Sequence, residues 1–142
     1  MPTRQELKKL SNLRLKEVKT LYGKGLYDGA SYLSGYIIEL ALKARICKIL
    51  DSDYIDSGRP ISRSFKTHNL DDLMILSGLS KKFHTELENN EALKINWSLI
   101  KSWNETFRYV PVGTKNKVEV QDLINAIENP TDGVFTWIKK RW

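Results

Sequence analysis

The segment from Tyr27 to about Leu50 constrains the fold most, because it is apolar on nearly all sides over the length of one long helix. At about 100° per residue, its side chains fall on two apolar faces rather than one. The first face comprises Ala30, Leu33, Ile37, Leu40, Ala41 and Ala44, and the second comprises Tyr32, Tyr36, Glu39, Lys43, Ile46 and Leu50. A helix on a protein surface has a single apolar face. We therefore predict that this helix is central and is covered on more than one side.

The second face also carries opposite charges, Glu39 and Lys43, in the order that favours an ion pair along a helix. Wherever this face is covered, each charge has a partner beside it. Arg14 projects from the apolar stripe of the preceding helix, and it either extends to the edge or pairs with a buried carboxylate, for which Glu39 is a candidate. Cys47 is expected to be a small buried hydrophobe.

Capping signals and hydrophobic periodicity predict further helices around the central one. Thr3 and Glu6 match a capping box that starts the first helix, and Asp28 is the expected cap of the central helix. Two later helices are expected from Thr67–Asn69 to Gly78 and from Ser80 to Asn89. A third carries Leu93, Trp97, Ile100, Trp103 and Phe107 and ends at Val110–Pro111. The last two carry Val120, Leu123, Ile124 and Ile127 up to Asn129, and Val134, Trp137 and Ile138.

No segment alternates with a period of two, which excludes regular half-buried strands. The polar stretch from Asp51 to about Lys66, with a turn at Ser57–Pro60, is expected to be a long loop. The predicted fold class is therefore all-α, a bundle of four to five main helices with a long central second helix.

The composition bounds the function as well as the fold. The chain has 142 residues, the size of one domain, and we expect a single domain over 1–142. One cysteine and two histidines offer almost no ligands for a metal site, so neither a metal nor a cofactor is expected. No apolar stretch reaches the roughly 18 residues that a membrane span needs, and the N-terminal residues are polar rather than signal-like. These features predict a soluble, cytoplasmic protein without membrane contact.

The formal net charge of +6 is distributed unevenly. Between Arg4 and Lys24 there are seven basic residues and two acidic ones, and lysines are expected to form a basic outer face on this first helix. Further basic clusters are Arg59, Arg63 and Lys66 in the middle loop and Lys139–Arg141 at the end. This balance fits a polyanionic partner, and it fits an ordinary lysine-rich soluble protein equally well.

The densest polar constellation is Trp103–Tyr109, in which two interpretations of Arg108 compete. Arg108 either bonds the last carbonyls of a helix and pairs with Glu105, or it offers its planar guanidinium to a phosphate with Tyr109 as a stacking or hydrogen-bonding neighbour. His68 stands at a helix start, where it either satisfies backbone groups as a neutral cap or takes part in catalysis.

Short motifs form an ordered series over nearly the whole chain. They are Gly25–Ala30 with Tyr32–Tyr36, Glu39–Ala44, Lys66–Leu70, Asn96–Trp97 with Trp103, Arg108–Tyr109, and Gly133–Val134 with Trp137–Ile138 and Trp142. This series resembles the HEPN superfamily of small helical domains. The resemblance implies a bundle of four to five helices that is usually dimeric. Members act as toxin or antiviral ribonucleases or as nucleotide- or RNA-binding modules, often beside a nucleotidyltransferase-like partner.

The chain departs from the ribonuclease members of that superfamily at one position. Those members carry an arginine followed four to six residues later by a histidine, at a composite site formed by the dimer. Arg108 matches the arginine, but no histidine follows His84. Cleavage at a 2′-hydroxyl needs a positioned base and acid, so the missing histidine weighs against nuclease activity. His68 could replace it only if the fold brings His68 beside Arg108.

These observations predict a module that binds a nucleotide or RNA as a homodimer, within a defence or toxin–antitoxin system. The expected ligand-binding residues are Arg108, Tyr109, His68, Lys43, Glu39 and Glu105. One alternative is a metal-independent ribonuclease toxin, for which Arg108 and His68 would be catalytic. Another is an interaction subunit for a nucleotidyltransferase-like partner. Four tryptophans and the all-round apolar helix favour a dimer, because they offer more apolar surface than a bundle of this size readily covers.

Overall fold

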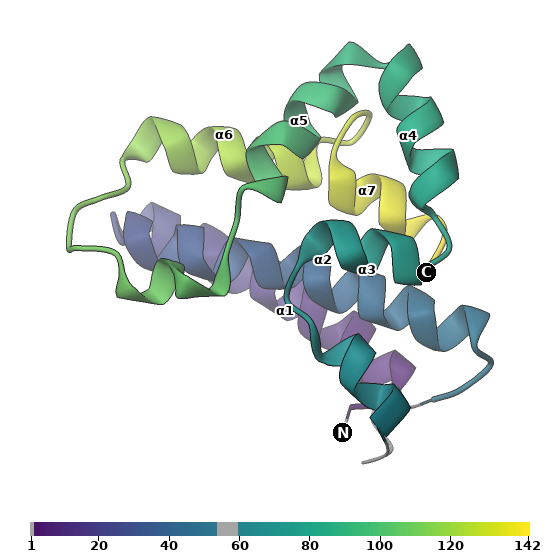
Figure 1. Cartoon of the computed structure of the whole chain (residues 1–142). Helices are drawn as coiled ribbons and strands as arrows, with labels where there is room; N and C mark the ends of the chain where they lie inside the picture. Colours follow the sequence, from purple (N-terminus) through teal and green to yellow (C-terminus); the bar gives the residue numbers. More distant parts are fainter. Residues whose placement is uncertain (1, 54–59) are drawn as a thin grey trace.

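The structure is a computed structural model that describes residues 2–53 and 60–142, and over these residues it is all-helical (Figure 1). The elements are α1 (Arg4–Gly23), α2 (Tyr27–Ile49), the 3₁₀ helix η1 (Pro60–Lys66), α3 (Leu70–Leu76), α4 (Ser80–Asn89), α5 (Glu91–Lys101), the 3₁₀ helix η2 (Glu105–Tyr109), α6 (Lys117–Glu128) and α7 (Val134–Lys139). The predicted all-α class is confirmed. Within the described ranges, no helix is both long and apolar enough to cross a membrane.

The long helix α2 is central, as its two apolar faces predicted. Helix α1 packs along it, and α3, α6, α7 and η2 contact its other sides (Figure 1). Residues of both faces are buried, among them Ile37 and Ile46, which have no exposed surface. Cys47 is buried within the same helix. A helix that is apolar all round becomes stable only when neighbours cover it on several sides, and here one chain supplies them.

Three of the four tryptophans are buried within the single chain and Trp142 is partly buried, contrary to the expected surplus of apolar surface. Trp97, Trp103 and Trp137 keep only 3%, 7% and 8% of their surface exposed. The Phe83 ring packs edge-on against Trp97 and Trp137, with centroid distances of 5.0 and 4.9 Å. The tryptophan argument for a dimer therefore does not hold, because these rings already fill the monomer core.

One predicted helix is shorter than expected. The helix that begins at Glu91 ends at Lys101 rather than near Val110, and Trp103 lies in the break before η2. The indole N–H of Trp103 donates to the carbonyl of Tyr32 at 2.8 Å, and the ring lies flat on α2 where a Cβ on Gly35 would overlap it. This tertiary contact overrides the helical spacing, because a continuous helix could not place the indole against Gly35.

Two sequence-predicted caps have different outcomes. The capping box of Thr3 and Glu6 is present, with both reciprocal hydrogen bonds formed. Asp28 does not cap α2, whose N-cap is Leu26. Its carboxylate instead accepts the backbone N–H groups of Gly113 and Lys115, at 2.7 and 2.8 Å. This carboxylate therefore fastens the loop that follows η2 to the start of α2.

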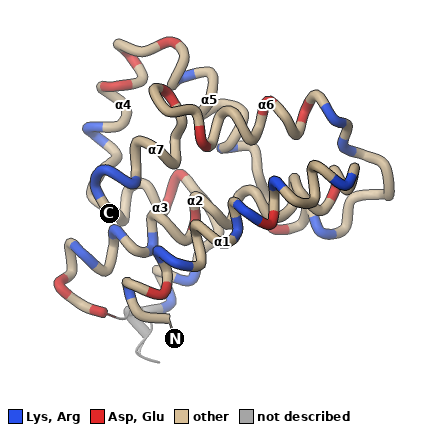
Figure 2. The backbone as a smooth tube through the Cα atoms, turned by 180° about the vertical axis from the view of Figure 1, so that it is seen from behind, with Lys and Arg blue, Asp and Glu red and all other residues tan. Residues whose placement is uncertain are grey.

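Lysine and arginine recur along the length of α1, as the colouring of the backbone shows (Figure 2). Lys9, Lys16 and Lys19 are exposed, as the predicted basic face requires, while Lys8 is half-buried. Arg14 pairs with Glu17 at 2.8 Å on its own helix, so its suggested pairing with Glu39 is wrong.

The middle loop is only partly described. Residues 60–66 form η1 where an irregular loop was expected. Of the predicted turn at Ser57–Pro60, residues 57–59, among them the basic residue Arg59, lie outside the described residues.

Candidate functional site

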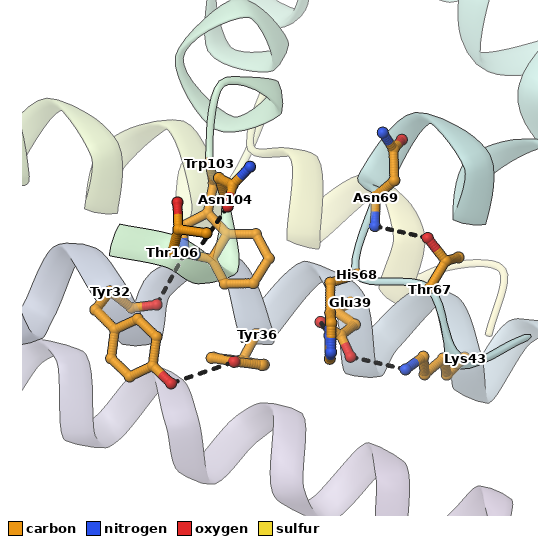
Figure 3. Close-up of polar contacts among 10 residues, drawn as sticks. All are labelled: Tyr32, Tyr36, Glu39, Lys43, Thr67, His68, Asn69, Trp103, Asn104 and Thr106. Atoms are coloured by element: carbon orange, nitrogen blue, oxygen red, sulfur yellow. Dashed lines mark hydrogen bonds and ion pairs between the residues drawn. The ribbon is translucent and has the colours of Figure 1, made fainter. Parts of the chain in front are cut away.

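A buried carboxylate on α2 lies at the centre of the candidate site. One oxygen of Glu39, Oε1, accepts a hydrogen bond from Nζ of Lys43 at 2.7 Å, and the other, Oε2, lies 2.9 Å from Nδ1 of His68 (Figure 3). The exposed fractions of the side chains are 4% for Glu39, 13% for Lys43 and 41% for His68. The sequence-predicted ion pair is therefore formed and largely buried, and a histidine from a distant segment completes it.

The histidine reaches Glu39 from the segment before α3. Asn69 caps α3 through its side chain, which accepts from the N–H of Asp72 at 3.0 Å, so the suggested capping role of His68 is wrong. An ionised carboxylate only accepts hydrogen bonds, which makes Nδ1 of His68 the donor. In a neutral imidazole, Nε2 then keeps its lone pair. The half-exposed ring thus offers a proton acceptor whose orientation Glu39 fixes.

A row of aromatic rings continues from His68 along α2. Tyr36 packs edge-on against His68, Trp103 and Tyr32, with centroid distances of 6.1, 4.9 and 5.5 Å. The hydroxyls of Tyr36 and Tyr32 lie 3.3 Å apart (Figure 3). Burial first, and then the hydrogen bond with Tyr32, raise the pKa of Tyr36 well above its usual value. The Tyr36 phenol therefore stays protonated and can donate.

Arg108 and Tyr109 lie at the end of η2, beyond this row. The guanidinium carbon of Arg108 is 4.8 Å from the centre of the Tyr109 ring. The phenol of Tyr109 in the first place, and then that of Tyr32, raise the pKa of Arg108 above its usual value. Arg108 is exposed, and 73% of Tyr109 is exposed. The two residues thus form a cationic and aromatic edge that is open to solvent.

The role of Arg108 as a helix cap paired with Glu105 is not observed. Within the described ranges, no hydrogen bond joins its guanidinium to a helix-terminal carbonyl, and no ion pair joins it to Glu105. The last amide of η2 is the N–H of Val110, which donates to the carbonyl of Phe107. The charge of Arg108 is therefore not engaged by a carboxylate of the described chain.

The fold brings five of the six predicted site residues to one side of α2 and leaves one apart. Glu39, Lys43 and His68 are in direct contact, whereas Arg108 and Tyr109 connect to them only through Tyr32 and Tyr36. The charge of Arg108 acts on Tyr36, whose pKa it lowers against the dominant effect of burial. His68 and Arg108 thus both act on the same tyrosine, and no hydrogen bond joins the two among the described residues.

Glu105 is the residue left apart. It lies in the first turn of η2, and among the described residues it makes no hydrogen bond or ion pair with the other five. Its place in the predicted site has no geometric support.

Three residues of the site were not predicted from sequence as site residues: Tyr32, Tyr36 and Trp103. The two tyrosines share a helical face with Glu39 and Lys43, so their position carried a usable signal. Trp103 carried none, because its place depends on the break after α5 and on the space above Gly35. No group of three or more His, Cys, Asp or Glu side chains within 2–53 and 60–142 is arranged to hold a metal ion.

Comparison of the chain with family models, curated proteins and solved structures finds no match. The resemblance to the HEPN superfamily accordingly stays a prediction, and the site is interpreted from its own geometry.

Proposed function

We propose that the edge formed by Arg108, Tyr109 and Tyr32 binds the phosphate and base of a nucleotide or of single-stranded RNA. The observation that carries the proposal is the exposed guanidinium of Arg108, which has no carboxylate partner among the described residues and stacks on an exposed tyrosine. A guanidinium binds a phosphate through two parallel hydrogen bonds. Tyrosine faces stack bases of any sequence. The combination suits a ligand that carries both groups.

The neighbouring charges are compatible with an anionic ligand. Lys43 lies 2.7 Å from Glu39, so the buried carboxylate is neutralised internally rather than repelling a phosphate. His68 then presents Nε2 next to the tyrosine row, where it can accept a hydrogen bond from a ribose hydroxyl. One of the Tyr32 and Tyr36 hydroxyls donates to the other, and the accepting hydroxyl can donate its own hydrogen to a phosphate oxygen.

A second candidate, a metal-independent ribonuclease, is favoured by one specific contact. The carboxylate–imidazole pair of Glu39 and His68 is the arrangement that orients a general base. In such a reaction His68 would take the proton of a 2′-hydroxyl, whose oxygen attacks the adjacent phosphorus. The bond from phosphorus to the 5′-oxygen breaks, which leaves a 2′,3′-cyclic phosphate, and a water molecule supplies the leaving 5′-oxygen with its proton. Arg108 would stabilise the charge on the phosphate.

Binding ranks first because the two expected catalytic partners do not touch within one chain. The Tyr36 ring centroid is 6.1 Å from that of His68, and Arg108 acts on the same tyrosine through its charge; no hydrogen bond joins His68 and Arg108 among the described residues. The phosphate contact needs only Arg108 and its aromatic neighbours, whereas cleavage needs both groups on one phosphate.

The homodimer, the nucleotidyltransferase-like partner and the cytoplasmic defence or toxin–antitoxin setting rest on the resemblance alone. We propose them in that sense. RNA and nucleotides are the ligands that such a setting would supply.

Titration calorimetry with AMP, GMP and a short single-stranded RNA, together with a gel assay for RNA cleavage, tests the proposal. Arg108→Ala should abolish binding of all three ligands while leaving the oligomeric state unchanged. Arg108→Lys should restore little, because an ammonium keeps the charge and loses the planar fork. Lys101→Ala, which removes an exposed cation at the end of α5, is the charge-matched control and should bind normally.

We expect no RNA cleavage by the wild-type protein. Unchanged affinity in Arg108→Ala would remove this residue from the site. Cleavage that is lost in both Arg108→Ala and His68→Ala would establish the ribonuclease instead.

A further inference from the structure

A second group of cations lies where the start of α1, the end of α2 and the C-terminal residues meet (Figure 2). We call it the terminal basic patch, and it consists of Arg4, Lys8, Arg45, Lys48 and Arg141. The segments are in direct contact. Nη1 of Arg45 and Nζ of Lys48 both donate to the carbonyl of Arg141, at 2.9 and 3.3 Å. Nζ of Lys8 lies 5.2 Å from the centre of the Trp142 ring.

The side chains of this patch have no ion-pair partner among the described residues. Burial first, and then the charges of Arg4 and Lys48, lower the pKa of Lys8. Burial lowers the pKa of Arg141; the carboxylate of Glu86 raises it and the charge of Arg45 lowers it, so that the net shift is downward. The fold therefore holds like charges close together.

Two of these arginines also have unused donors. Nε of Arg4 and Nε of Arg141 are buried and make no hydrogen bond in the structure. Crowded cations and unpaired donors both raise the free energy of the folded chain. A polyanion bound to the exposed atoms of the patch would offset the repulsion between the cations, and it would release condensed counterions as it bound.

We propose that the terminal basic patch binds the phosphate backbone of a nucleic acid as a second contact surface, separate from Arg108. A membrane surface fits less well, because it would require an amphipathic helix with a free apolar face. The apolar side of α1 is occupied by α2, and Leu7 and Val18 are 3% and 0% exposed. The cations are instead fixed by contacts among three segments, which suits a ligand with regularly spaced phosphates.

The position of the patch sets a minimum length for a ligand that reaches both surfaces. Tyr32 and Lys48 are about 24 Å apart along α2 at 1.5 Å per residue, and about 160° apart around it at 100° per residue. A stacked strand advances about 3.4 Å per nucleotide, so about seven stacked nucleotides cover the distance along the helix. The inference thus makes the partner a polynucleotide, whereas the first proposal also admits a mononucleotide.

The test compares the double variant Arg4→Gln/Lys8→Gln with wild type. Neither side chain makes a hydrogen bond among the described residues, so the fold should remain intact. Binding of a single-stranded RNA of about 20 nucleotides, followed by fluorescence anisotropy at several salt concentrations, should weaken about tenfold or more at low salt. The slope of log affinity against log salt should become shallower by about 1.4, since each cation that neutralises a phosphate of a single strand adds about 0.7 to it. Binding of AMP should be unchanged.

A matched control removes the same net charge elsewhere. Lys16→Gln/Lys94→Gln replaces two exposed lysines outside the patch and should keep the wild-type affinity and slope. The melting temperature of Arg4→Gln/Lys8→Gln should equal or exceed that of wild type, because its like charges are relieved.

Three outcomes would overturn the inference. The salt slope of RNA binding could be unchanged in the patch variant, or RNA affinity could fall equally in the control variant. In a parallel assay with vesicles of anionic lipid, the patch variant could lose vesicle binding while it keeps RNA binding. The experiments can refute the Arg108 proposal separately from the patch proposal. Loss of RNA binding in the patch variant, together with unchanged AMP and RNA binding in Arg108→Ala, would keep this surface and remove that one.

Discussion

At the scale of single residues, function depends on how buried or exposed each charge is. Glu39 and Lys43 are charged side chains that the core accepts because they neutralise each other at 2.7 Å. Arg108 is exposed and has no such partner in the described chain. Removing one member of the buried pair should therefore affect folding, whereas removing Arg108 should affect binding.

Lys43→Met should destabilise the protein by about 3 kcal/mol, because it leaves the carboxylate of Glu39 buried without its cation. For a chain of this size, that corresponds to a drop of about 10 °C in melting temperature. Thermal unfolding followed by circular dichroism measures it. Lys16→Met, at an exposed position on α1, should change the melting temperature little. The double variant Glu39→Gln/Lys43→Met should recover part of the stability, since no unpaired charge remains. A shift of a degree or less in the single variant would contradict the buried-pair interpretation.

Asp28 makes the stability of the loop after η2 depend on pH. The backbone N–H of Lys115, and then that of Gly113, lower the pKa of Asp28 in the folded state. Because the folded value lies below the unfolded one, the contribution is present above the unfolded pKa of about 4. It is lost as the pH falls through the lower, folded value.

Asp28→Asn should accordingly lower the urea midpoint of unfolding at pH 6, and the difference from wild type should shrink at pH 3. Asp122→Asn, which alters an exposed carboxylate on α6, is the control and should show no such convergence. A deficit of Asp28→Asn that is the same at both pH values would show that the carboxylate charge is not what holds the loop.

At the scale of the elements, Gly35 on α2 determines where η2 lies. The Trp103 ring occupies the space that a Cβ at Gly35 would fill, and the indole N–H is fixed on the carbonyl of Tyr32. Trp103 directly precedes the cap of η2, so this single contact places Arg108 and Tyr109 beside the tyrosine row.

Gly35→Ala should therefore destabilise the protein by about 1–3 kcal/mol, the usual cost of overpacking a core, and should also weaken AMP binding by displacing η2. Gly29→Ala is a matched control on the same helix. Its Cβ would meet only Cδ1 of Leu21 at 3.6 Å, an ordinary contact, and alanine should stabilise the helix by about 0.5–1 kcal/mol. Chemical denaturation and calorimetry on both variants measure the two effects. Equal stability of both variants would contradict the role given to Gly35.

At the scale of the whole molecule, the described helices surround α2 without leaving Trp97, Trp103 or Trp137 open to a partner. These three side chains are all buried within one chain. Dimerisation is therefore not required to complete the core. The resemblance to the HEPN superfamily implies a different role for a dimer, namely a site shared between two copies. In such a site, His68 of one copy could approach Arg108 of the other.

We predict that the protein is a homodimer in solution. Light scattering at tens of micromolar should give twice the monomer mass of 16.4 kDa. Arg108→Ala should retain that mass, because the residue is proposed to contact ligand. A monomer mass for the wild type would count against both the dimer and a ribonuclease site shared between copies.

The sequence by itself determined the helical class, the central position of α2 and the pairing of Glu39 with Lys43. Each follows from periodicity or from spacing within one helix, which depends on local geometry alone. The capping box at Thr3 is local in the same sense.

Only the tertiary structure decided how residues distant in sequence meet. The contact of His68 with Glu39 and that of Trp103 with Gly35 join segments 29 and about 70 residues apart. The carboxylate of Asp28 binds a loop 85 residues away instead of its own helix. No local pattern records these contacts, because they depend on which helices pack together and on the space left between their side chains. For this reason the sequence supplied the α2 face with its charges and its two tyrosines, and the fold brought His68 and Trp103 onto that face.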